Sequence, residues 1–450
     1  MNECAVVVRS GVDSYEKLLS DGFADEVFSL VRKAVSPGQT VVVKPNLVAE
    51  HRWDHPNETV QIVTHAAVVE RIVREAVCAL HGCGRVVIAD APQTDSDYEA
   101  IARLLDLDGI VQRCSANTTV AVEHFDLREE KWITREGVTV GKKQLAGDPL
   151  GYCEIDLGSE SLFEGKANKT YYGADYDQAE TARYHNDRNN IYVMSNTVLA
   201  CDVFINVPKL KTHKLGGLTC SLKNAVGTCV VKNSLPHHTT GVPDEGGDQF
   251  FSATKKSHVE RALKGMAATL LKHKNPLISY PIGLVKKGAG KVLGSQGSQT
   301  IRNGSWYGND TIWRTTLDLN RILLYADRYG IMRDGLQRAY LTIVDAVIAA
   351  EGDGPLDADA KECGVLMAGT NPVAVDFAAA RLMGFDWRCV PTISHAFDSM
   401  RWPLASFTSD DVCIAGACSK WSGRVVDVEP ASTLAFKPHF GWVGHVELGS

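Results

Sequence analysis

Residues 41–46 read VVVKPN, and residues 65–90 read HAAVVERIVREAVCALHGCGRVVIAD. The first stretch is a short β-branched strand that ends at a proline, which cannot donate a hydrogen bond to a neighbouring strand. The second stretch places apolar residues at helical spacing, and two glycines end the helix before another strand at 86–89. A strand, a helix and a strand form a βαβ unit, so the sequence predicts parallel strands joined by a right-handed crossover.

Later stretches add further strands. An apolar run at 203–207 leads into a lysine-rich loop, the run 341–344 is expected to end at Asp345, and the run 364–368 leads through the residues GTNP into another helix. We therefore predict the α/β class, with a mostly parallel, Rossmann-like sheet and helices on both faces. In an open sheet of this kind, ligands bind beyond the carboxyl ends of the strands.

Two polar stretches interrupt the predicted core, and a short tail follows it. The tail has short alternating runs, which are typical of β structure. We expect a first part of the α/β core at 1–125, a polar loop-rich insertion at 126–190, a core strand with the lysine-rich loop and a helix at 191–230, a basic insertion at 231–310, the second part of the core at 311–405, and a small β appendage at 406–450.

Composition excludes several classes of protein. The 450 residues are 44% hydrophobic and 22% charged, as in an ordinary globular chain, and the net charge of −7 disfavours a generally basic nucleic-acid binder. No run approaches the roughly 18 apolar residues of a membrane span, so we expect a cytoplasmic protein. The twelve cysteines include no C-x-x-C pair, and we therefore expect no iron–sulfur cluster.

The clearest functional signal is the stretch 203–229, which reads VFINVPKLKTHKLGGLTCSLKNAVGTC. Lysines crowd between the end of a strand and the start of a helix, where unpaired backbone N–H groups favour an anion. Histidine titrates near neutral pH, so His213 can serve as a general base or as a metal ligand. We predict catalytic roles for His213, Lys211 and Lys223, and substrate contacts from Lys44, Asn46, Lys209, Thr212, Lys214 and Asn224.

Carboxylates form a second candidate group. Asp345 is expected at a strand end, Asp353 lies in the glycine-rich stretch EGDGP, and Asp376 follows the first turn of the predicted helix after GTNP. Oxygen ligands of this kind suit Mg²⁺ or Mn²⁺, so these three aspartates are the predicted ligands of a divalent metal ion. The alternative interpretation is that they are turn residues and surface charges.

A basic segment lies inside the second insertion. From Lys255 to Arg302 there are ten lysine or arginine residues and one acid, Glu260, although the whole chain is acidic. Such a segment can contact a membrane surface, an anionic glycan or another anionic polymer, close over a substrate as a lid, or remain a solvated face. It supports a competing hypothesis, in which the protein is a non-catalytic binding protein that docks through residues 255–302.

Common nucleotide and hydrolase motifs are absent. The sequence has no G-x-G-x-x-G after its first strand, no G-x-x-x-x-G-K-[ST] and no G-x-S-x-G. These absences argue against a dinucleotide-binding protein, a P-loop protein and a serine hydrolase.

The lysine-rich loop and the three aspartates together lead us to expect an enzyme. It would bind a phosphorylated or carboxylated small molecule between the two insertions, with a divalent metal ion assisting and with His213 moving the proton.

In several separated motifs the chain resembles the DUF362 family, a domain of unknown function. The resemblance rests on the motifs VKPNL at 43–47, PKLKTH at 208–213 with SLKN at 221–224, EGDGP at 351–355 and GTNPVAVD at 369–376. Many relatives carry a ferredoxin-like cysteine motif, which this chain lacks. A fainter likeness of plan to nickel-pincer lactate racemases would make Lys211 or Lys223 a cofactor attachment point and His213 a base.

Overall fold

The computed structural model describes residues 2–51, 58–135, 138–252, 301, 303–416 and 419–449. Within these residues, one large sheet of eleven strands has the order β17-β16-β1-β15-β14-β10-β2-β3-β4, and β11 and β12 join it beside β14. Its strands are β1 (Ala5–Arg9), β2 (Thr40–Pro45), β3 (Arg85–Asp90), β4 (Ala121–Asp126), β10 (Val203–Val207), β11 (Lys209–His213), β12 (Gly217–Thr219), β14 (Ala339–Asp353), β15 (Asp357–Gly369), β16 (Cys413–Ala415) and β17 (Gly423–Arg424).

The predicted βαβ unit is present, and so is the predicted α/β fold. β2 continues into α2 (Ala66–Ala79) and then β3, and β2 pairs in parallel with both β3 and β10. β10 in turn pairs in parallel with β14. The carboxyl ends of these strands therefore meet at one edge of the sheet, as the sequence predicted.

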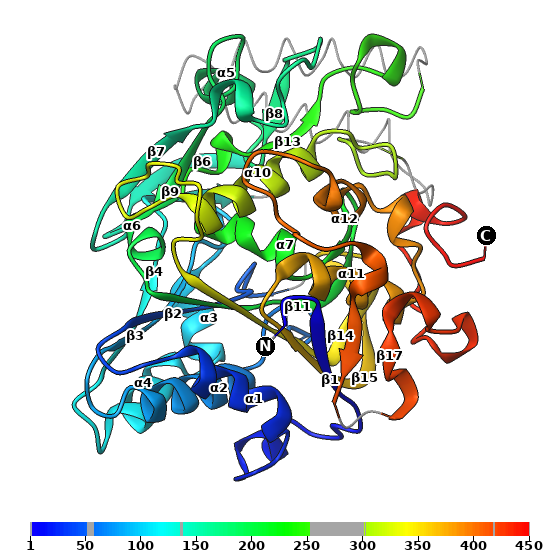
Figure 1. Ribbon diagram of the computed structural model, residues 1–450. Helices are drawn as coiled ribbons and strands as arrows, with labels where there is room; N and C mark the ends of the chain where they lie inside the picture. The colour runs from blue at the N-terminus through cyan, green and yellow to red at the C-terminus, as the bar shows by residue number, and fades with distance from the viewer. Residues whose placement is uncertain are drawn as a thin grey trace.

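Helices cover both faces of the sheet (Figure 1). One face packs against α1 (Asp25–Ala34), α2, α3 (Tyr98–Leu104) and α4 (Leu107–Ser115), because alternate strand residues such as Val41 and Val43 point toward these helices. The other face, which includes Val42, packs against α6 (Asn196–Leu199), α7 (Ser221–Asn224) and α10 (Ile312–Tyr325). α11 (Pro372–Met383) and α12 (Pro391–Ser394) lie on this second side, where α11 covers β14 and β15.

The second half of the sheet differs from the prediction in two ways. The strand expected to end at Asp345 continues to Asp353, because the apolar residues after Asp345 remain suited to a buried strand. It then turns into β15, which is antiparallel to β14. The end of β15 pairs with Thr342, which lies opposite Asn206 of β10, so α11 begins near the carboxyl end of β10 although it follows an antiparallel strand.

The C-terminal tail belongs to the main sheet. β16 pairs in parallel with β1, and β17 forms the outer edge. The two runs that suggested β structure are 412–414 and 425–428. The first overlaps β16, whereas Val425–Asp427 is a 3₁₀ helix. The tail thus extends the edge of the core sheet.

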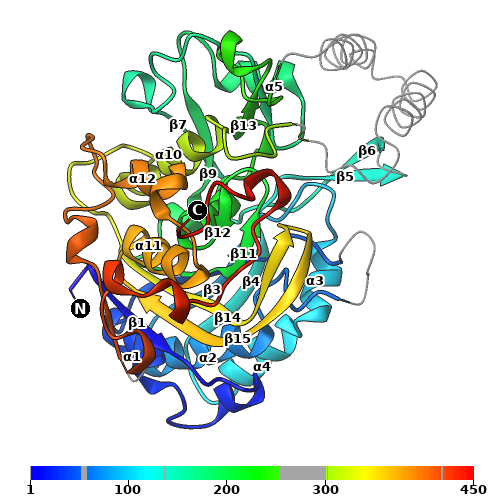
Figure 2. The same ribbon diagram turned by 90° about the vertical axis from the view of Figure 1, so that its right-hand side faces the viewer.

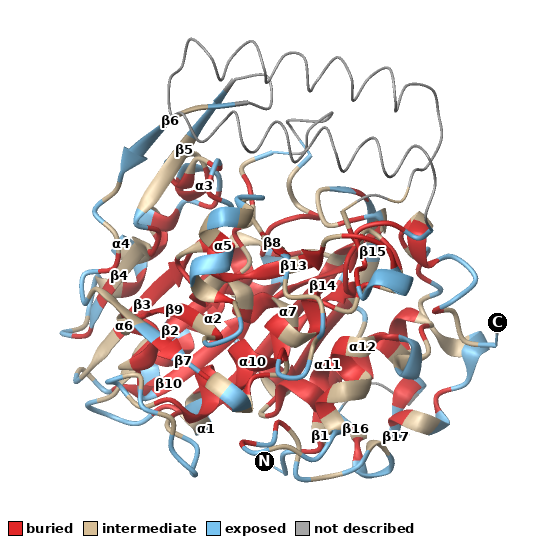
Figure 3. Ribbon diagram, turned by 90° about the horizontal axis from the view of Figure 1, so that it is seen from above, coloured by how far each residue is buried: buried red, intermediate tan, exposed pale blue. Residues whose placement is uncertain are grey.

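The two insertions contact each other. The first contains the hairpin β5 (Glu130–Arg135) and β6 (Val138–Gln144), strands β7 (Tyr152–Asp156) and β8 (Tyr171–Gly173), and helix α5 (Gln178–Tyr184). β7 pairs with β9 (Ile191–Ser195), which follows the insertion. β8 pairs with β13 (Pro236–Thr239) of the second insertion. Figure 3 shows the β5–β6 hairpin at the exposed periphery, whereas the central strands are buried.

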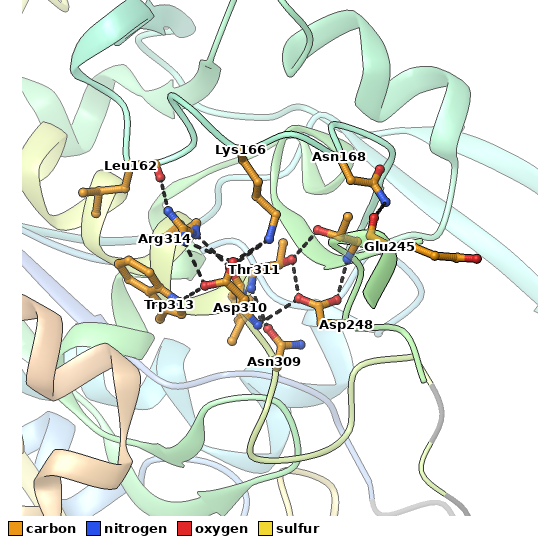
Figure 4. Close-up of polar contacts among 12 residues, drawn as sticks. Leu162, Lys166, Asn168, Glu245, Asp248, Asn309, Asp310, Thr311, Trp313 and Arg314 are labelled. Carbon is orange, nitrogen blue, oxygen red and sulfur yellow. Dashed lines mark hydrogen bonds and ion pairs between the residues drawn. The ribbon is translucent and has the colours of Figure 1, made fainter. Parts of the chain in front are cut away.

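Polar contacts fasten the insertions to the start of α10 (Figure 4). Lys166 Nζ forms an ion pair with Asp310 Oδ2 at 2.7 Å, and Arg314 binds the same carboxylate from the next helical turn. Asp248 accepts hydrogen bonds from the backbone N–H groups of Thr239 and Asp310. Burial raises the pKa of Asp248 to about 6. This network holds the base of the second insertion against the core.

The basic segment 255–302 lies outside the described residues, apart from Ile301, so the structure does not bear on the docking hypothesis. Among the residues that are described, no helix has the length and apolarity needed to cross a membrane.

Candidate anion-binding site

The predicted site forms where β2, β11 and α7 meet. In the parallel register, Asn206 of β10 lies opposite Lys44 of β2. Asn224 of α7 donates to Asn206 Oδ1 at 2.7 Å and accepts from Asn46 Nδ2 at 2.9 Å. Lys211 Nζ then donates to Asn46 Oδ1 at 2.7 Å. A continuous chain of hydrogen bonds therefore joins the motifs at 43–47, 208–213 and 221–224.

Lys44 is a buried and fully paired lysine. Its Nζ lies 2.8 Å from Asp90 Oδ1 and also donates to Pro45 O at 2.9 Å and to Asn224 Oδ1 at 3.2 Å. Gly227 packs directly on this pair, since a Cβ atom there would lie 2.6 Å from Lys44 Nζ. A glycine is therefore required where the chain crosses the Lys44–Asp90 ion pair.

Lys209 is also paired, and it belongs to the protein interior. Its Nζ lies 2.6 Å from Asp345 Oδ2, and Tyr15 OH donates to the other oxygen of that carboxylate at 2.8 Å. The backbone N–H of His65 completes the shell around Asp345. Lys209 and Asp345 are both 0% exposed. We predicted that Lys209 contacts the substrate and that Asp345 binds a metal ion. In the structure the two side chains instead form an ion pair with each other in the interior.

Lys211 differs from Lys209 although it lies only two residues further along β11. Lys211 is 1% exposed, and the two oxygen atoms that its ammonium contacts, Asn46 Oδ1 and Ile62 O, are both uncharged. Burial lowers the pKa of Lys211 well below its usual value, and Lys209, Lys223 and Lys44 lower it further. The positive charge of Lys211 therefore has no carboxylate partner among the described residues.

Lys223 is the most available amine of the group. It is partly exposed, and within the described part of the chain it makes no hydrogen bond or ion pair. Burial, together with the nearby positive charges of Lys232 and Lys44, lowers the pKa of Lys223 to about 7. Lys232 is buried and donates to Ala91 O at 2.7 Å and Cys229 O at 2.9 Å. Sequence reasoning missed Lys232, which lies beyond the motif.

Lys214 lies in the turn that connects β11 to β12. Burial lowers the pKa of Lys214, and the negative charge of Asp357 opposes that change. Its carbonyl oxygen accepts a hydrogen bond from Trp442 Nε1 at 2.9 Å. Figure 2 shows the C-terminal segment, coloured red, running beside β12, where Trp442 packs against Gly217. The tail therefore covers one side of the lysine-rich loop.

His213 is held as a hydrogen-bond donor. Its Nδ1 accepts hydrogen bonds from the backbone N–H groups of Leu215 at 3.1 Å and Gly216 at 3.2 Å. That nitrogen must be unprotonated, so the proton of the neutral ring lies on Nε2. Burial lowers the pKa of His213 well below 6.5, and Lys223 and Lys214 add to this effect. The predicted role as a general base does not fit this tautomer, since the only lone pair of the ring is occupied.

His237 has the opposite arrangement. Its Nδ1 lies 2.8 Å from Leu235 O and donates to it, so the lone pair of the neutral ring lies on Nε2. Burial and the charge of Lys223 are the leading causes that lower the pKa of His237 to about 3. We did not predict this residue. It reaches the site because β13 pairs with β8, and the only sequence signal was the adjacent His-His pair after Pro236.

Two threonines of the loop have different surroundings. Thr212 Oγ1 donates to Gly352 O at 2.8 Å and so binds the β14–β15 hairpin, away from the predicted substrate contact. Thr219 lies directly opposite Lys211 in the β11–β12 pair, and opposite residues share a face. Thr219 is 4% exposed, and its hydroxyl has no hydrogen-bond partner among the described residues. The Thr219 hydroxyl without a partner and the Lys211 side chain without a carboxylate thus lie on one face of the β11–β12 pair.

The three aspartates predicted to hold a metal ion lie apart. Asp345 and Asp353 are separated by eight residues of one strand, or about 26 Å at ~3.3 Å per residue. Asp376 lies on the opposite face of the sheet, where it accepts from the backbone N–H groups of Ser221 at 2.6 Å and Leu222 at 3.1 Å. Among the described residues, no three acidic, histidine or cysteine side chains form a metal-binding group. These three carboxylates cannot share one ion, because packing gives each a different neighbour.

Fold and site together define a class: an α/β protein with a lysine-rich loop at the carboxyl edge of its parallel strands. The family model described as Domain of unknown function (DUF362) matches residues 41–145 and 137–381. These matches cover more than half of the 450 residues, so the chain belongs to the DUF362 family. The resemblance drawn from the motifs is confirmed, and β1 and the C-terminal segment lie outside the matched residues. No curated protein matches the sequence.

Proposed function

We propose that this protein is an enzyme that binds a phosphorylated or carboxylated small molecule against Lys211, Lys223 and His213. The observation that carries the proposal is that two lysines of the site have no carboxylate partner among the described residues. Lys44 and Lys209 each have a carboxylate partner, whereas Lys211 has only neutral acceptors and Lys223 has none among the described residues. A bound anion would supply the missing negative charge.

Energetics favours this interpretation over a purely structural role. Burying a charged group without a partner costs several kcal/mol even after the protein relaxes. A lysine that served only the fold would therefore be expected to have a carboxylate nearby, as Lys209 has Asp345 at 2.6 Å. Lys211 lacks such a partner, and the hydroxyl of Thr219 beside it is also unsatisfied. An anionic group with several acceptor oxygens would satisfy both.

Catalysis, in addition to binding, is supported by the three titratable groups that share the site. His213 presents an N–H donor, His237 presents a lone pair, and Lys223 has a pKa of about 7. Perturbed titratable groups that differ in their protonation states are typical of active sites. Lys44, Asn46 and Asn224 would hold the lysines in place, because their hydrogen bonds join the three motifs.

The proposal is tested by anion-dependent stability. Sulfate is a suitable probe, since it keeps its charge across neutral pH. A ligand present at 100 times its dissociation constant stabilises the folded state by about 2.7 kcal/mol. We expect sulfate to raise the melting temperature of the wild type, measured against chloride at equal ionic strength, and the Lys211→Met and Lys223→Met variants to lose most of this increase.

A surface lysine provides the control. Lys420 is exposed and lies over the Trp421 ring, so Lys420→Met should keep the full response to sulfate. This control is needed because sulfate also stabilises proteins by exclusion from their surface. An equal increase in the wild type and all three variants would show that only this general effect operates, and the proposed anion site would then be wrong.

A further inference from the structure

Lys223 stands apart from the other lysines of the site. Lys44, Lys211 and Lys232 are buried, and each donates to at least two oxygen atoms. Lys223 is partly exposed and makes no hydrogen bond or ion pair among the described residues. Among the described lysines of the site, only Lys214 shares this combination of partial exposure and missing side-chain hydrogen bonds. Burial lowers the pKa of Lys214 as well, but the negative charge of Asp357 opposes that change. The surroundings of Lys223 thus leave its amine free to react.

The charged neighbours of Lys223 also favour the neutral amine. The groups that act on it are Lys232 and Lys44, both positive, and burial adds to their effect. An amine that is desolvated beside other cations loses its proton near neutral pH and becomes a nucleophile. The fold places no carboxylate against Lys223 within the described residues, which would otherwise hold the proton on the nitrogen.

We infer that Lys223 forms an imine with a carbonyl group of the bound molecule, so that the substrate is a small anionic aldehyde or ketone. This inference rests on the proposed anion site and assigns the chemistry of that site. Lys211 and the Nε2–H of His213 would bind the anionic group or the carbonyl oxygen, and Nε2 of His237 would accept a proton.

The step balances without a further reactant. The nitrogen lone pair of Lys223 attacks the carbonyl carbon, a C–N bond forms, and the π electrons move to the oxygen. His237 accepts one proton from the nitrogen and passes it to the oxygen, which gives a neutral carbinolamine. The nitrogen lone pair then expels the hydroxyl group, the remaining N–H proton passes to it through His237, and water leaves. The amine and the carbonyl compound thus yield an imine and one water molecule, with no oxidation or reduction.

Reductive trapping tests the inference on the full chain. Glyoxylate, a small aldehyde with a carboxylate, is incubated with the protein and cyanoborohydride, which reduces an imine to a stable secondary amine. The labelled lysines are then identified by mass spectrometry after digestion with a protease that does not cut at lysine. At pH 7 about half of the Lys223 side chains are unprotonated if their pKa is about 7. For an ordinary lysine the unprotonated fraction at this pH is less than about one in a thousand. We expect Lys223 to be labelled at least about tenfold faster than Lys420, allowing for its lower intrinsic nucleophilicity.

The conservative variant Lys223→Arg separates charge from reactivity. Arginine keeps a positive charge but cannot form the imine, so this variant should retain a large part of its sulfate response and lose the fast labelling. Labelling of the wild type should also level off above pH 7 to 8, whereas labelling of Lys420 should keep rising toward pH 10. Both readouts are insensitive to a purely structural role of Lys223.

Failure of the inference and failure of the proposed function look different. Equal labelling of Lys223 and Lys420, with a normal sulfate response that Lys211→Met abolishes, would overturn the imine and leave the anion site intact. Faster labelling of Lys214 than of Lys223 would overturn the choice of amine. Fast labelling of Lys223 with no sulfate response would overturn the anion site, and with it the proposed class of substrate.

Discussion

Lys209 and Lys211 provide a matched pair, since both are buried lysines of β11 and only one faces a carboxylate. Replacing Lys209 with methionine leaves Asp345 buried and uncompensated, a change that typically costs about 3–5 kcal/mol. Tyr15 and the backbone N–H of His65 still donate to that carboxylate, which favours the lower end of this range.

Replacing Lys211 with methionine changes the free energy of unfolding in two opposite directions. It removes two hydrogen bonds, each with a net value of about 1 kcal/mol, but it also removes an unpaired buried charge that costs several kcal/mol. We therefore expect Lys211→Met to lie within about 1 kcal/mol of the wild type, or to be more stable. The two variants should differ in unfolding free energy by at least about 2 kcal/mol.

Urea unfolding, followed by tryptophan fluorescence and by circular dichroism, measures this difference if the buffer contains no sulfate or phosphate. The double variant with Lys209→Met and Asp345→Leu removes both charges and should recover much of the stability lost in Lys209→Met. Equal losses in Lys209→Met and Lys211→Met would refute the reasoning, because they would show that the charge of Lys211 is already compensated within the protein.

Three further predictions concern other parts of the site. The Cβ atom of Gly227→Ala would overlap Asp90 Oδ1 and displace Lys44, so we expect the free energy of unfolding in urea to fall by about 1–3 kcal/mol. The same variant should show a smaller sulfate-induced rise in melting temperature. The sulfate-induced rise in melting temperature should be present below pH 7 and decline between pH 7 and 9, since Lys223 loses its proton as the pH rises through its pKa of about 7. Trp442→Ala should cost about 3–5 kcal/mol in urea unfolding, because this buried ring packs on Gly217 and its Nε1 donates to Lys214 O.

The sequence was sufficient to predict the α/β fold and the meeting of three motifs. Both follow from local signals, namely strand and helix periodicity and the rule that parallel strands share a carboxyl edge. Lys44, Asn46, Lys211 and Asn224 are joined as expected because β2, β11 and α7 meet at that edge. The antiparallel turn of β15 was not predicted. Asp376 lies beside the start of α7, where it accepts hydrogen bonds from the backbone N–H groups of Ser221 and Leu222.

Contacts between distant segments account for the rest of the site. His237 reaches the lysines through the pairing of β13 with β8, two short strands from separate insertions, and neither strand has a pattern that specifies its partner. The role of His213 depends on two backbone N–H groups of the following turn, which determine where its proton lies. Residue type alone suggested a base at His213, whereas the hydrogen bonds assign the free lone pair to His237.

The different surroundings of the two β11 lysines come from an irregularity in the sheet. Lys209 lies opposite Asp345 of β14, but the register then shifts, and Lys211 lies opposite Ala350. Two residues along β11 therefore correspond to five residues along β14. As a result, Lys211 lies opposite a residue five positions beyond Asp345, the carboxylate that neutralises Lys209. Bulges of this kind are common beside active sites, where they redirect a side chain. The shift separates the Lys209–Asp345 ion pair from a buried lysine without a carboxylate partner within one short strand.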